Sequence, residues 1–286
     1  MTDSEQYNVG GLTLQASGKW LLERMHAMPE WQVFRQMHTS DSSLTVLHRE
    51  RVHSVPSPVL ADESFALENG VVCRIKADGQ RISVHFSCGL LLAADITNQP
   101  GMATLDGSSD DGTLRYALWM AYALGALQKG AMQIHASAVL CNGQAVLCLG
   151  ESGAGKSTHT RLWLEHIDGC QLLNDDCPVV RIEERGVEAY GSPWSGKTPC
   201  YRQEHAPVAA MVRIVKSPHN RITRLRGAEA FIELHRSCPP ELQHTAATSE
   251  EATTFAVGVV NSVPVYRLEC RPDQEAALLC HNTIFA

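Results

Sequence analysis

The chain has 286 residues, of which 44% are hydrophobic and 19% are charged, a composition typical of a globular protein with a sizeable core. Its 24 Lys and Arg residues against 31 Asp and Glu residues give a net charge of −7, which excludes a general attraction to nucleic acid or to an anionic membrane. No apolar run reaches the length of about 18 residues that a transmembrane helix needs, and the acidic residues 1–6 do not resemble a signal peptide.

The ten cysteines are scattered along the chain, and none of them forms a C-x-x-C pair. This spacing argues against a zinc or redox site. Several cysteines stand in apolar runs and are interpreted as small buried hydrophobic residues. Together with the absence of a signal peptide, this pattern predicts a location in the reducing cytoplasm.

Residues 1–110 are expected to form a β-rich segment without a catalytic motif of its own. Asn69-Gly70 separates the apolar runs 65–68 and 71–75, which is a strong signal for a β-hairpin. Residues 81–86 alternate between apolar and polar side chains, as a half-buried strand does. The pattern predicts an antiparallel meander that serves for packing; a contribution to substrate binding is the alternative.

A loop of small and acidic residues at 105–112 sets the predicted boundary between this segment and a second domain, residues 111–286. Residues 114–127 then predict a buried helix. Next, the turn Asn142-Gly143 joins the apolar runs 134–141 and 145–149, so the second of these strands is expected to pair with the first in antiparallel fashion.

The clearest motif follows directly, because residues 150–158 read GESGAGKST and match the phosphate-binding pattern G-x-x-x-x-G-K-[ST]. A buried strand precedes the motif, and a helix over 158–167 is predicted after it, which is the order that a P-loop requires. The alternative is a chance glycine turn before a helix. Lys156 is expected to contact the β- and γ-phosphates and Ser157 to bind Mg²⁺. The predicted nucleotide-binding residues are Gly150, Glu151, Ser152, Gly153, Ala154, Gly155, Lys156, Ser157 and Thr158.

Three further residues are predicted to serve catalysis. A strand over 170–174 ends in Asp175-Asp176, where a P-loop enzyme needs an Mg²⁺ ligand and a catalytic base; the alternative is a polar turn before Pro178. His135 begins the strand that precedes the P-loop strand, and the hairpin brings it near the loop. A buried histidine with a structural role is the alternative for His135.

Two cationic stretches follow. Lys197 and Arg202, in a loop over 191–202, are predicted to neutralise a transferring phosphate or to hold an anionic substrate; a plain surface loop is the alternative. The second stretch is either a patch that steers an acidic acceptor or a solvated strand and turn, and it consists of Arg213, Lys216, Arg221, Arg224 and Arg226. Downstream, a helix is predicted over 227–234, and strands over 255–260 and 265–268.

Residues 134–176 resemble the superfamily of HPr kinase/phosphorylase and ATP-dependent phosphoenolpyruvate carboxykinase. The resemblance rests on Ile134-His135-Ala136-Ser137, on the P-loop, and on Leu172-Leu173-Asn174-Asp175-Asp176. Residues 190–234, with the stretch GSPWSGKT at 191–198, are similar to uncharacterised bacterial proteins related to HPr kinase. The resemblance covers about half of the chain and does not extend to residues 1–110.

The resemblance implies roles for His135, Asp175 and Asp176. In the carboxykinase, the matching His and one Asp bind a second metal; in HPr kinase, the matching His and Asp pair serve proton transfer and metal positioning around a protein serine. The chain is shorter than a full carboxykinase and has no counterpart of its oxaloacetate-binding residues. It also lacks the downstream HPr kinase motif with a glutamate ligand. The acceptor, and which Asp is base and which is ligand, therefore stay open.

These observations predict an α/β protein with a mixed, partly antiparallel sheet, of the carboxykinase-like P-loop kinase type. The predicted function is transfer of the γ-phosphoryl group of ATP, with Mg²⁺, to a hydroxyl, as in serine kinases of the HPr kinase type. A short carboxykinase-like enzyme and a non-catalytic ATP-binding regulator are the alternatives. The expected partners are ATP and a protein, peptide or small-molecule acceptor, without nucleic acid or membrane; a homo-oligomer is left open.

Overall fold

The computed structural model describes residues 4–37, 41–50, 63–78, 81–196, 198–244 and 246–286. It contains two compact units, unit 1 with residues 1–129 and 241–251 and unit 2 with residues 130–240 and 252–286. Both units combine helices with sheets that contain parallel and antiparallel strand pairs, so the prediction of a mixed α/β protein is confirmed at this level. Within the described ranges, no helix is long and apolar enough to cross a membrane.

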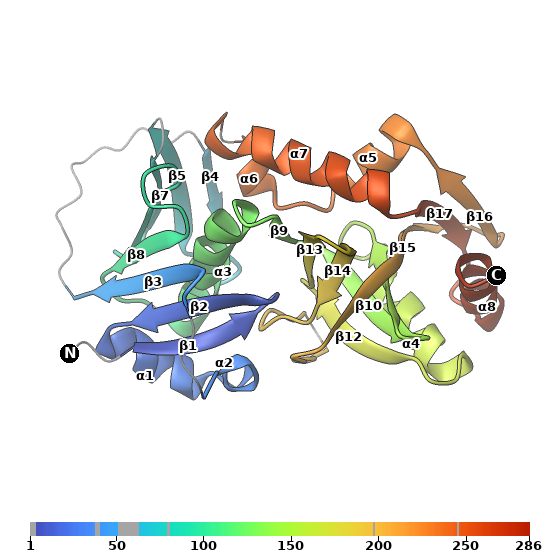
Figure 1. Cartoon of the computed structure of the whole chain (residues 1–286), viewed down its shortest axis with the longest axis horizontal. Helices are drawn as coiled ribbons and strands as arrows, with labels where there is room; N and C mark the ends of the chain where they lie inside the picture. Colours follow the sequence, from blue (N-terminus) through green and yellow to red (C-terminus); the bar gives the residue numbers. More distant parts are fainter. Residues whose placement is uncertain (1–3, 38–40, 51–62, 79–80, 197, 245) are drawn as a thin grey trace. The chain divides into compact units, whose positions relative to one another are not determined.

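Unit 1 is built on an eight-stranded sheet with the order β1-β2-β3-β8-β7-β6-β5-β4. Strands β4 to β6 form the predicted antiparallel meander, with Asn69-Gly70 in the turn between β4 and β5, and β7 and β8 extend it beyond the predicted strands. Helix α3 packs on β3, β7 and β8 (Figure 1). The elements are β1 (Ser4–Val9), β2 (Leu12–Ser17), α1 (Lys19–Ala27), α2 (Pro29–Phe34), β3 (Leu44–Arg49), β4 (Glu63–Ala66), β5 (Val72–Asp78), β6 (Arg81–Phe86), β7 (Leu91–Asp95), β8 (Met102–Asp106) and α3 (Asp111–Leu127).

The division between the units differs from the predicted boundary at residue 110. Helix α3 belongs to unit 1 because it is buried along almost its whole length against that unit's sheet. Its start follows the capping rules, since the Asp110 side chain accepts a hydrogen bond from the Thr113 backbone N–H. The polar loop at 105–112 therefore lies within unit 1, before α3, instead of separating two units.

Unit 2 contains a second sheet with the order β12-β10-β11-β15-β14-β13-β9, to which β17 and β16 add beside β15. The P-loop strand β11 pairs antiparallel with β10 and parallel with β15. The elements up to the long strand are β9 (Ala131–Gln133), β10 (Ala136–Cys141), β11 (Gln144–Leu149), α4 (Lys156–His166), β12 (Gln171–Asp176), β13 (Val179–Glu183), β14 (Gly186–Tyr190) and β15 (His205–Lys216). The remaining elements of unit 2 are β16 (Arg221–Leu225), α5 (Gly227–His235), β17 (Val265–Cys270) and α8 (Gln274–Ile284). Helices α6 (Pro240–His244) and α7 (Ala246–Ser262) are divided between the units, because residues 241–251 belong to unit 1.

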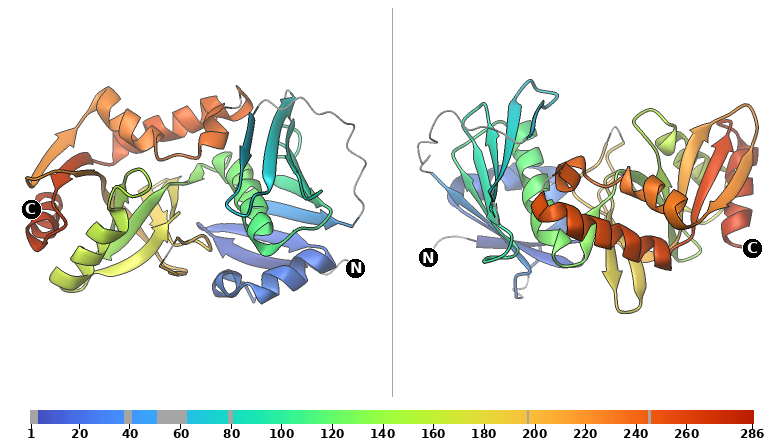
Figure 2. Two further views of the ribbon diagram at one scale, coloured as in Figure 1. Left: turned by 180° about the vertical axis from the view of Figure 1, so that it is seen from behind. Right: turned by 90° about the horizontal axis from the view of Figure 1, so that it is seen from above.

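Helices α4 and α8 lie together on one face of the central strands of unit 2, and α5 lies on the other face (Figure 1, Figure 2). The core of the first face joins Trp163 of α4 and Cys280 of α8 to Cys148, Val212 and Leu268 of the strands. Burial of these apolar side chains fixes α4 against β11, the strand that leads into the P-loop.

Strand β10 pairs with both strands whose ends carry the predicted site, and its register brings these two ends to the same edge of the sheet. Ala136 pairs with Leu149 at the end of β11 and also with Asp176 at the end of β12. Because neighbouring strands lie about 4.8 Å apart, the ends of β11 and β12 are separated by roughly 10 Å across β10. On this side of β11 the neighbour is thus the antiparallel strand β10, where most P-loop proteins have a parallel strand. The pairing still brings the Asp pair to the loop.

Two expectations from the sequence are wrong or incomplete. Residues 255–260 were predicted as a strand but belong to α7, because the short apolar run continues a helix that begins at Ala246. Several cysteines were expected as small buried hydrophobic residues, but Cys141 and Cys170 are joined by a disulfide beside the paired strands β10 and β12. Most of the other cysteines are free and buried, as expected.

We predict that His159 makes unit 2 less stable at acidic pH. His159 of α4 is 2% exposed, and burial lowers its pKa to about 4. Its folded pKa lies below the unfolded value, so the unfolded state binds the extra proton between about pH 6.5 and pH 4 and stability falls as the pH falls. Urea unfolding should show that His159→Gln removes about 2 kcal/mol of the stability difference between pH 7.5 and pH 5. The exposed His219→Gln should keep the wild-type difference; equal pH dependence in all three proteins would contradict this account.

A second prediction concerns the entry to the loop after β14. A Cβ on Gly191 would lie 2.0 Å from the Arg202 carbonyl oxygen, which is backbone and cannot rotate away. Gly191→Ala should therefore lower the free energy of unfolding by about 1–3 kcal/mol, the usual cost of overpacking. Gly258→Ala is the matched control, because its Cβ would meet only the Ile182 Cδ1 atom at the end of a flexible side chain. An unchanged denaturation midpoint for Gly191→Ala would show that the loop moves freely.

Candidate functional site

The P-loop of residues 150–155 leads from β11 into α4. Gly155 caps the helix with a φ of +108°, a conformation that a residue with a side chain rarely adopts. A Cβ on Gly150 would lie 2.8 Å from the Ala154 Cβ, so the loop can close on itself only because this position is glycine. The free N–H groups at the start of α4 and the helix dipole make this end of the helix suited to an anion.

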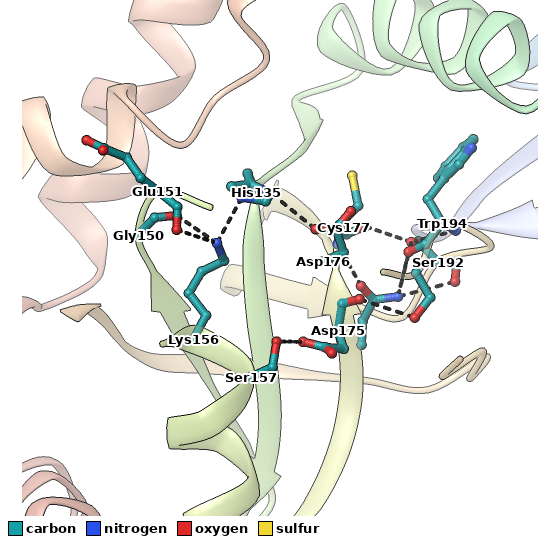
Figure 3. Close-up of polar contacts among 12 residues, drawn as sticks. His135, Gly150, Glu151, Lys156, Ser157, Asp175, Asp176, Cys177, Ser192 and Trp194 are labelled. Carbon is teal, nitrogen blue, oxygen red and sulfur yellow. Dashed lines mark hydrogen bonds and ion pairs between the residues drawn. The ribbon is translucent and has the colours of Figure 1, made fainter. Parts of the chain in front are cut away.

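Lys156, the first residue of α4, folds back over the loop. Its ammonium donates to the carbonyl oxygens of Gly150 at 2.8 Å and Glu151 at 3.2 Å and contacts His135 Nε2 at 2.8 Å (Figure 3). Lys156 is only 8% exposed. Burial lowers its pKa, while the Asp176 and Asp175 carboxylates act in the opposite direction. The ammonium is therefore a poorly hydrated cation with fixed direction, which favours binding of a phosphate.

His135 connects Lys156 to Asp176. It lies immediately before β10, where its backbone N–H donates to the Ser237 carbonyl oxygen at 2.8 Å. An ammonium has no acceptor, so Nε2 of His135 accepts from Lys156 and the ring proton is assigned to Nδ1. Nδ1 faces Asp176 Oδ1 at 3.3 Å, and both side chains are nearly half exposed (Figure 3). Ammonium, imidazole and carboxylate thus form one polar chain.

Asp175 makes a separate contact with α4. Its Oδ1 atom accepts from the Ser157 hydroxyl at 2.8 Å (Figure 3), and Asp175 is 4% exposed whereas Ser157 is exposed. The adjacent carboxylates therefore have different surroundings, Asp175 against the P-loop serine and Asp176 against His135. This difference separates two residues that the sequence alone leaves equivalent.

The loop after β14 holds the Asp pair in place. The Asp175 carbonyl oxygen accepts from the Gly196 N–H at 2.6 Å and from the Ser195 hydroxyl at 3.2 Å. Asn174, fully buried, donates from Nδ2 to the Trp194 carbonyl oxygen at 3.0 Å and accepts from the Cys177 N–H at 2.8 Å. No role for Asn174 follows from the sequence motifs; a polar side chain inside an apolar strand, directly before two acids, is the signal that could have found it.

Asp176 has a φ of +136°, which is rare for a residue with a side chain. Such a conformation costs on the order of 1–3 kcal/mol and persists only where the surroundings determine it. Here the bonds to Asn174 and to the Asp175 carbonyl hold the chain on both sides of the strained residue. The strain turns the Asp176 side chain toward His135 while Asp175 faces Ser157.

Arg202, one of the two cations predicted in the 191–202 loop, is not brought to the site. The Arg202 guanidinium donates to Gln171 Oε1 at 2.7 Å, at the start of β12, while Asp176 stands at the end of that strand. Five residues of strand separate these positions by about 16 Å. Lys197 lies outside the described residues. Loop length alone cannot tell which end of a neighbouring strand a loop residue reaches.

A different arginine lies beside the P-loop. Arg213 of β15 pairs in register with Leu149, the last residue before the loop, and is 8% exposed. It was predicted only as part of a basic stretch. That stretch is not one patch, because Arg213 is buried whereas Arg221 and Arg224 are exposed on β16. A cation inside a strand of apolar residues is the signal that distinguishes it.

A cavity of about 320 Å³ borders the end of the P-loop and the start of α4. It is lined by Gly155 and Thr158 on one side and by Ile214, Lys216 and Arg271 near the ends of β15 and β17 on the other. The volume lies at the small end of the range for ligand pockets. Ligands of α/β sheets bind outside the carboxyl ends of parallel strands, which is where this cavity lies.

The chemistry of the residues fits Mg²⁺ better than a metal held by the protein alone. In the part of the chain that the structure describes, no group of three or more His, Cys, Asp and Glu side chains could hold a metal ion. Ser157 and Asp175 offer one hydroxyl and one carboxylate 2.8 Å apart. Mg²⁺ is usually bound by one or two carboxylates together with water and substrate phosphates, so these residues suit it as part of a nucleotide complex.

Comparison with known proteins gives a weak similarity at the level of structure. No protein family profile matches the chain, and no curated protein sequence matches it. Among solved structures, the HPr(Ser) kinase/phosphatase from Coxiella burnetii is similar over 53% of this chain and 87% of that chain, with 17% sequence identity and a TM-score of 0.31. The chain therefore has a weak structural resemblance to this kinase/phosphatase.

Proposed function

We propose that unit 2 is an ATP-dependent phosphotransferase that moves the γ-phosphoryl group to a hydroxyl of a protein, peptide or small molecule. The observation that carries the proposal is the division of labour between the adjacent acids. Asp175 contacts the P-loop Ser157, and Asp176 contacts His135, which in turn contacts Lys156. A phosphotransferase needs both a metal-binding carboxylate and a base near its P-loop.

In this proposal the P-loop backbone and Lys156 hold the phosphates, and Ser157 and Asp175 hold Mg²⁺. The ion would neutralise charge on the β- and γ-phosphates. The cavity beside Thr158 receives the nucleoside, since it borders the helical end of the loop. These assignments place the nucleoside and the pair His135–Asp176 at different ends of the P-loop, so the transferring phosphate and the acceptor meet at Lys156.

Asp176 then takes the proton of the acceptor hydroxyl. The acceptor oxygen forms its bond to the γ-phosphorus, the bond from that phosphorus to the β–γ bridging oxygen breaks, and ADP carries the electron pair away. His135 orients the Asp176 carboxylate and keeps it near Lys156. A regulator that only binds ATP would need no carboxylate at this position, so the placement of Asp176 favours catalysis. A serine acceptor, which the resemblance to HPr kinase implies, is part of the proposal.

The first prediction from this proposal concerns Lys156. Lys156→Ala should weaken binding of Mg·ATP by about 10- to 100-fold, because charged hydrogen bonds to the phosphates are lost. The fold should remain, since the substitution removes a buried charge. Calorimetric titration with Mg·ATP measures the effect, and Lys129→Ala, an exposed lysine of unit 1, is the control. Wild-type affinity in a folded Lys156→Ala protein would contradict nucleotide binding by the P-loop.

The second prediction separates the two acids. Asp175→Asn should raise the Mg²⁺ concentration needed for tight ATP binding, because the carboxylate that contacts the Ser157 hydroxyl is lost. Asp176→Asn should bind Mg·ATP normally and transfer phosphate about 10²- to 10⁴-fold more slowly, the usual contribution of a positioned base. Titrations at several Mg²⁺ concentrations and transfer from γ-labelled ATP to proteins of a cell lysate measure the two effects. The reverse pattern would make Asp176 the metal ligand and Asp175 the base. Normal binding and transfer in both variants would show that the pair is only part of a turn.

A further inference from the structure

The environment of Arg213 points to a role that neither the motif nor the comparison assigns. Its neighbours Val212 and Ile214 belong to the core under α4. Because side chains alternate along a strand, Arg213 faces the opposite side of the sheet, where α5 lies. Its backbone pairs with Leu149, the residue that precedes Gly150. The structure therefore contains a nearly buried cation beside the first residues of the P-loop.

Glu233 of α5 holds this arginine. Glu233 is 5% exposed, and its Oε2 atom lies 3.4 Å from Arg213 Nε, while Arg267 Nη2 donates to Oε1 at 2.8 Å. The Arg236 guanidinium also lies 3.9 Å from Oε2, and a buried carboxylate among three guanidinium groups neutralises charge that would otherwise be costly to bury. Besides the contact of its Nε with Glu233, the Arg213 guanidinium donates from Nη2 to Glu151 Oε1 of the P-loop at 3.3 Å.

The end of the loop that Arg213 reaches is the end on which Lys156 rests. The Lys156 ammonium donates to the carbonyl oxygens of Gly150 and Glu151. In a P-loop this lysine contacts the β- and γ-phosphates, so residues 150–151 mark that end of the polyphosphate. Arg213 also lowers the pKa of Lys156, although less than burial does, which agrees with two cations in electrostatic reach of each other. Two converging cations favour an anion with more charge than one carboxylate.

Glu151 supplies a carboxylate at this position from the chain itself. Its side chain is 81% exposed, whereas that of Arg213 is 10% exposed. An ion pair with one freely hydrated partner contributes little to stability. The Glu151 carboxylate can therefore leave Arg213 at little cost, and a phosphate can take its place.

We propose that Arg213 is a second phosphate-binding cation at the β/γ end of the P-loop, that Glu233 positions it, and that Glu151 competes with the phosphate for it. The proposal rests on the function proposed above and deepens it. It assigns to Arg213 the charge neutralisation that the sequence analysis expected from Lys197 or Arg202. It also predicts a preference for nucleoside triphosphate over diphosphate, because the added phosphate is the group nearest to this end of the loop.

Calorimetric titration of the full chain with Mg·ATP and with Mg·ADP tests the proposal. Arg213→Gln should weaken ATP binding by about 10-fold or more and ADP binding by less than about 3-fold. Glu151→Gln should strengthen ATP binding by about 3-fold and leave ADP binding unchanged, since it removes only a competitor at the surface. Arg224→Gln, an exposed arginine on β16, is the matched control and should leave both affinities unchanged.

Glu233 is tested as a positioning residue. Glu233→Gln should reduce the ratio of ATP to ADP affinity, and Glu233→Asp should restore part of it. A purely structural role would change both affinities in parallel and leave their ratio as in the wild type. That result for Glu233→Gln would overturn the assignment of Glu233.

The outcomes also separate this inference from the proposed function. Weaker ATP binding in Lys156→Ala together with wild-type ATP and ADP affinities in folded Arg213→Gln would overturn the role of Arg213 and leave the P-loop proposal standing. If Arg213→Gln does not fold, the Glu151→Gln variant tests the inference, because an exposed loop side chain can be changed without affecting the core. Unchanged or weaker ATP binding by Glu151→Gln would overturn the inference. A wild-type protein that does not bind Mg·ATP would overturn both.

Discussion

The contact between a buried ammonium and the carbonyl groups of its own loop is the interaction on which the candidate site depends. Lys156 is 8% exposed, yet its partners in the described structure are the Gly150 and Glu151 carbonyl oxygens and His135, all formally neutral in the assigned tautomer. The carbonyl oxygens solvate the charge in place of water but do not neutralise it. The Asp175 and Asp176 carboxylates stabilise the charged form from farther away. The loop therefore keeps a net positive end that favours an anion.

The arrangement of strands explains why both acids can reach this cation. With β10 between β11 and β12, the ends of β11 and β12 lie at one level, and Ala136 pairs with a residue of each. Asp175 extends toward α4 and meets Ser157, whereas the strained backbone at Asp176 turns its side chain toward the start of β10. An ordinary extended strand would send the two side chains to opposite faces of the sheet. The positive φ of Asp176 permits two adjacent residues to serve one site.

The sequence was sufficient for the parts of the fold that local rules determine. Alternation, Asn-Gly turns and the P-loop spacing located the β4–β5 and β10–β11 hairpins, α4 and the Asp pair at the end of β12. Prediction from the sequence failed where the secondary structure depends on packing against distant parts of the chain. The apolar residues 255–260 fit a strand as well as a helix, and only their continuity with the preceding turns makes them part of α7.

The same limit applies to the cations. Arg202 and Arg213 look alike in the sequence, one in a loop of small residues near the Asp pair and the other inside a basic stretch. Their surroundings differ because β15 runs parallel to β11 and carries Arg213 to the P-loop, while the loop before it carries Arg202 to the start of β12. Which of the two arginines lies at the P-loop depends on the pairing of strands that are distant in the sequence, and a single sequence does not reveal this pairing. Burial adds to the difference, because Arg213 is buried beside Glu233 of α5, whereas Arg202 contacts Gln171 and Glu204 at the surface. A fixed cation loses little entropy when a phosphate arrives, which is why the buried arginine, and not the exposed one in the more suggestive loop, is the better partner for the P-loop lysine.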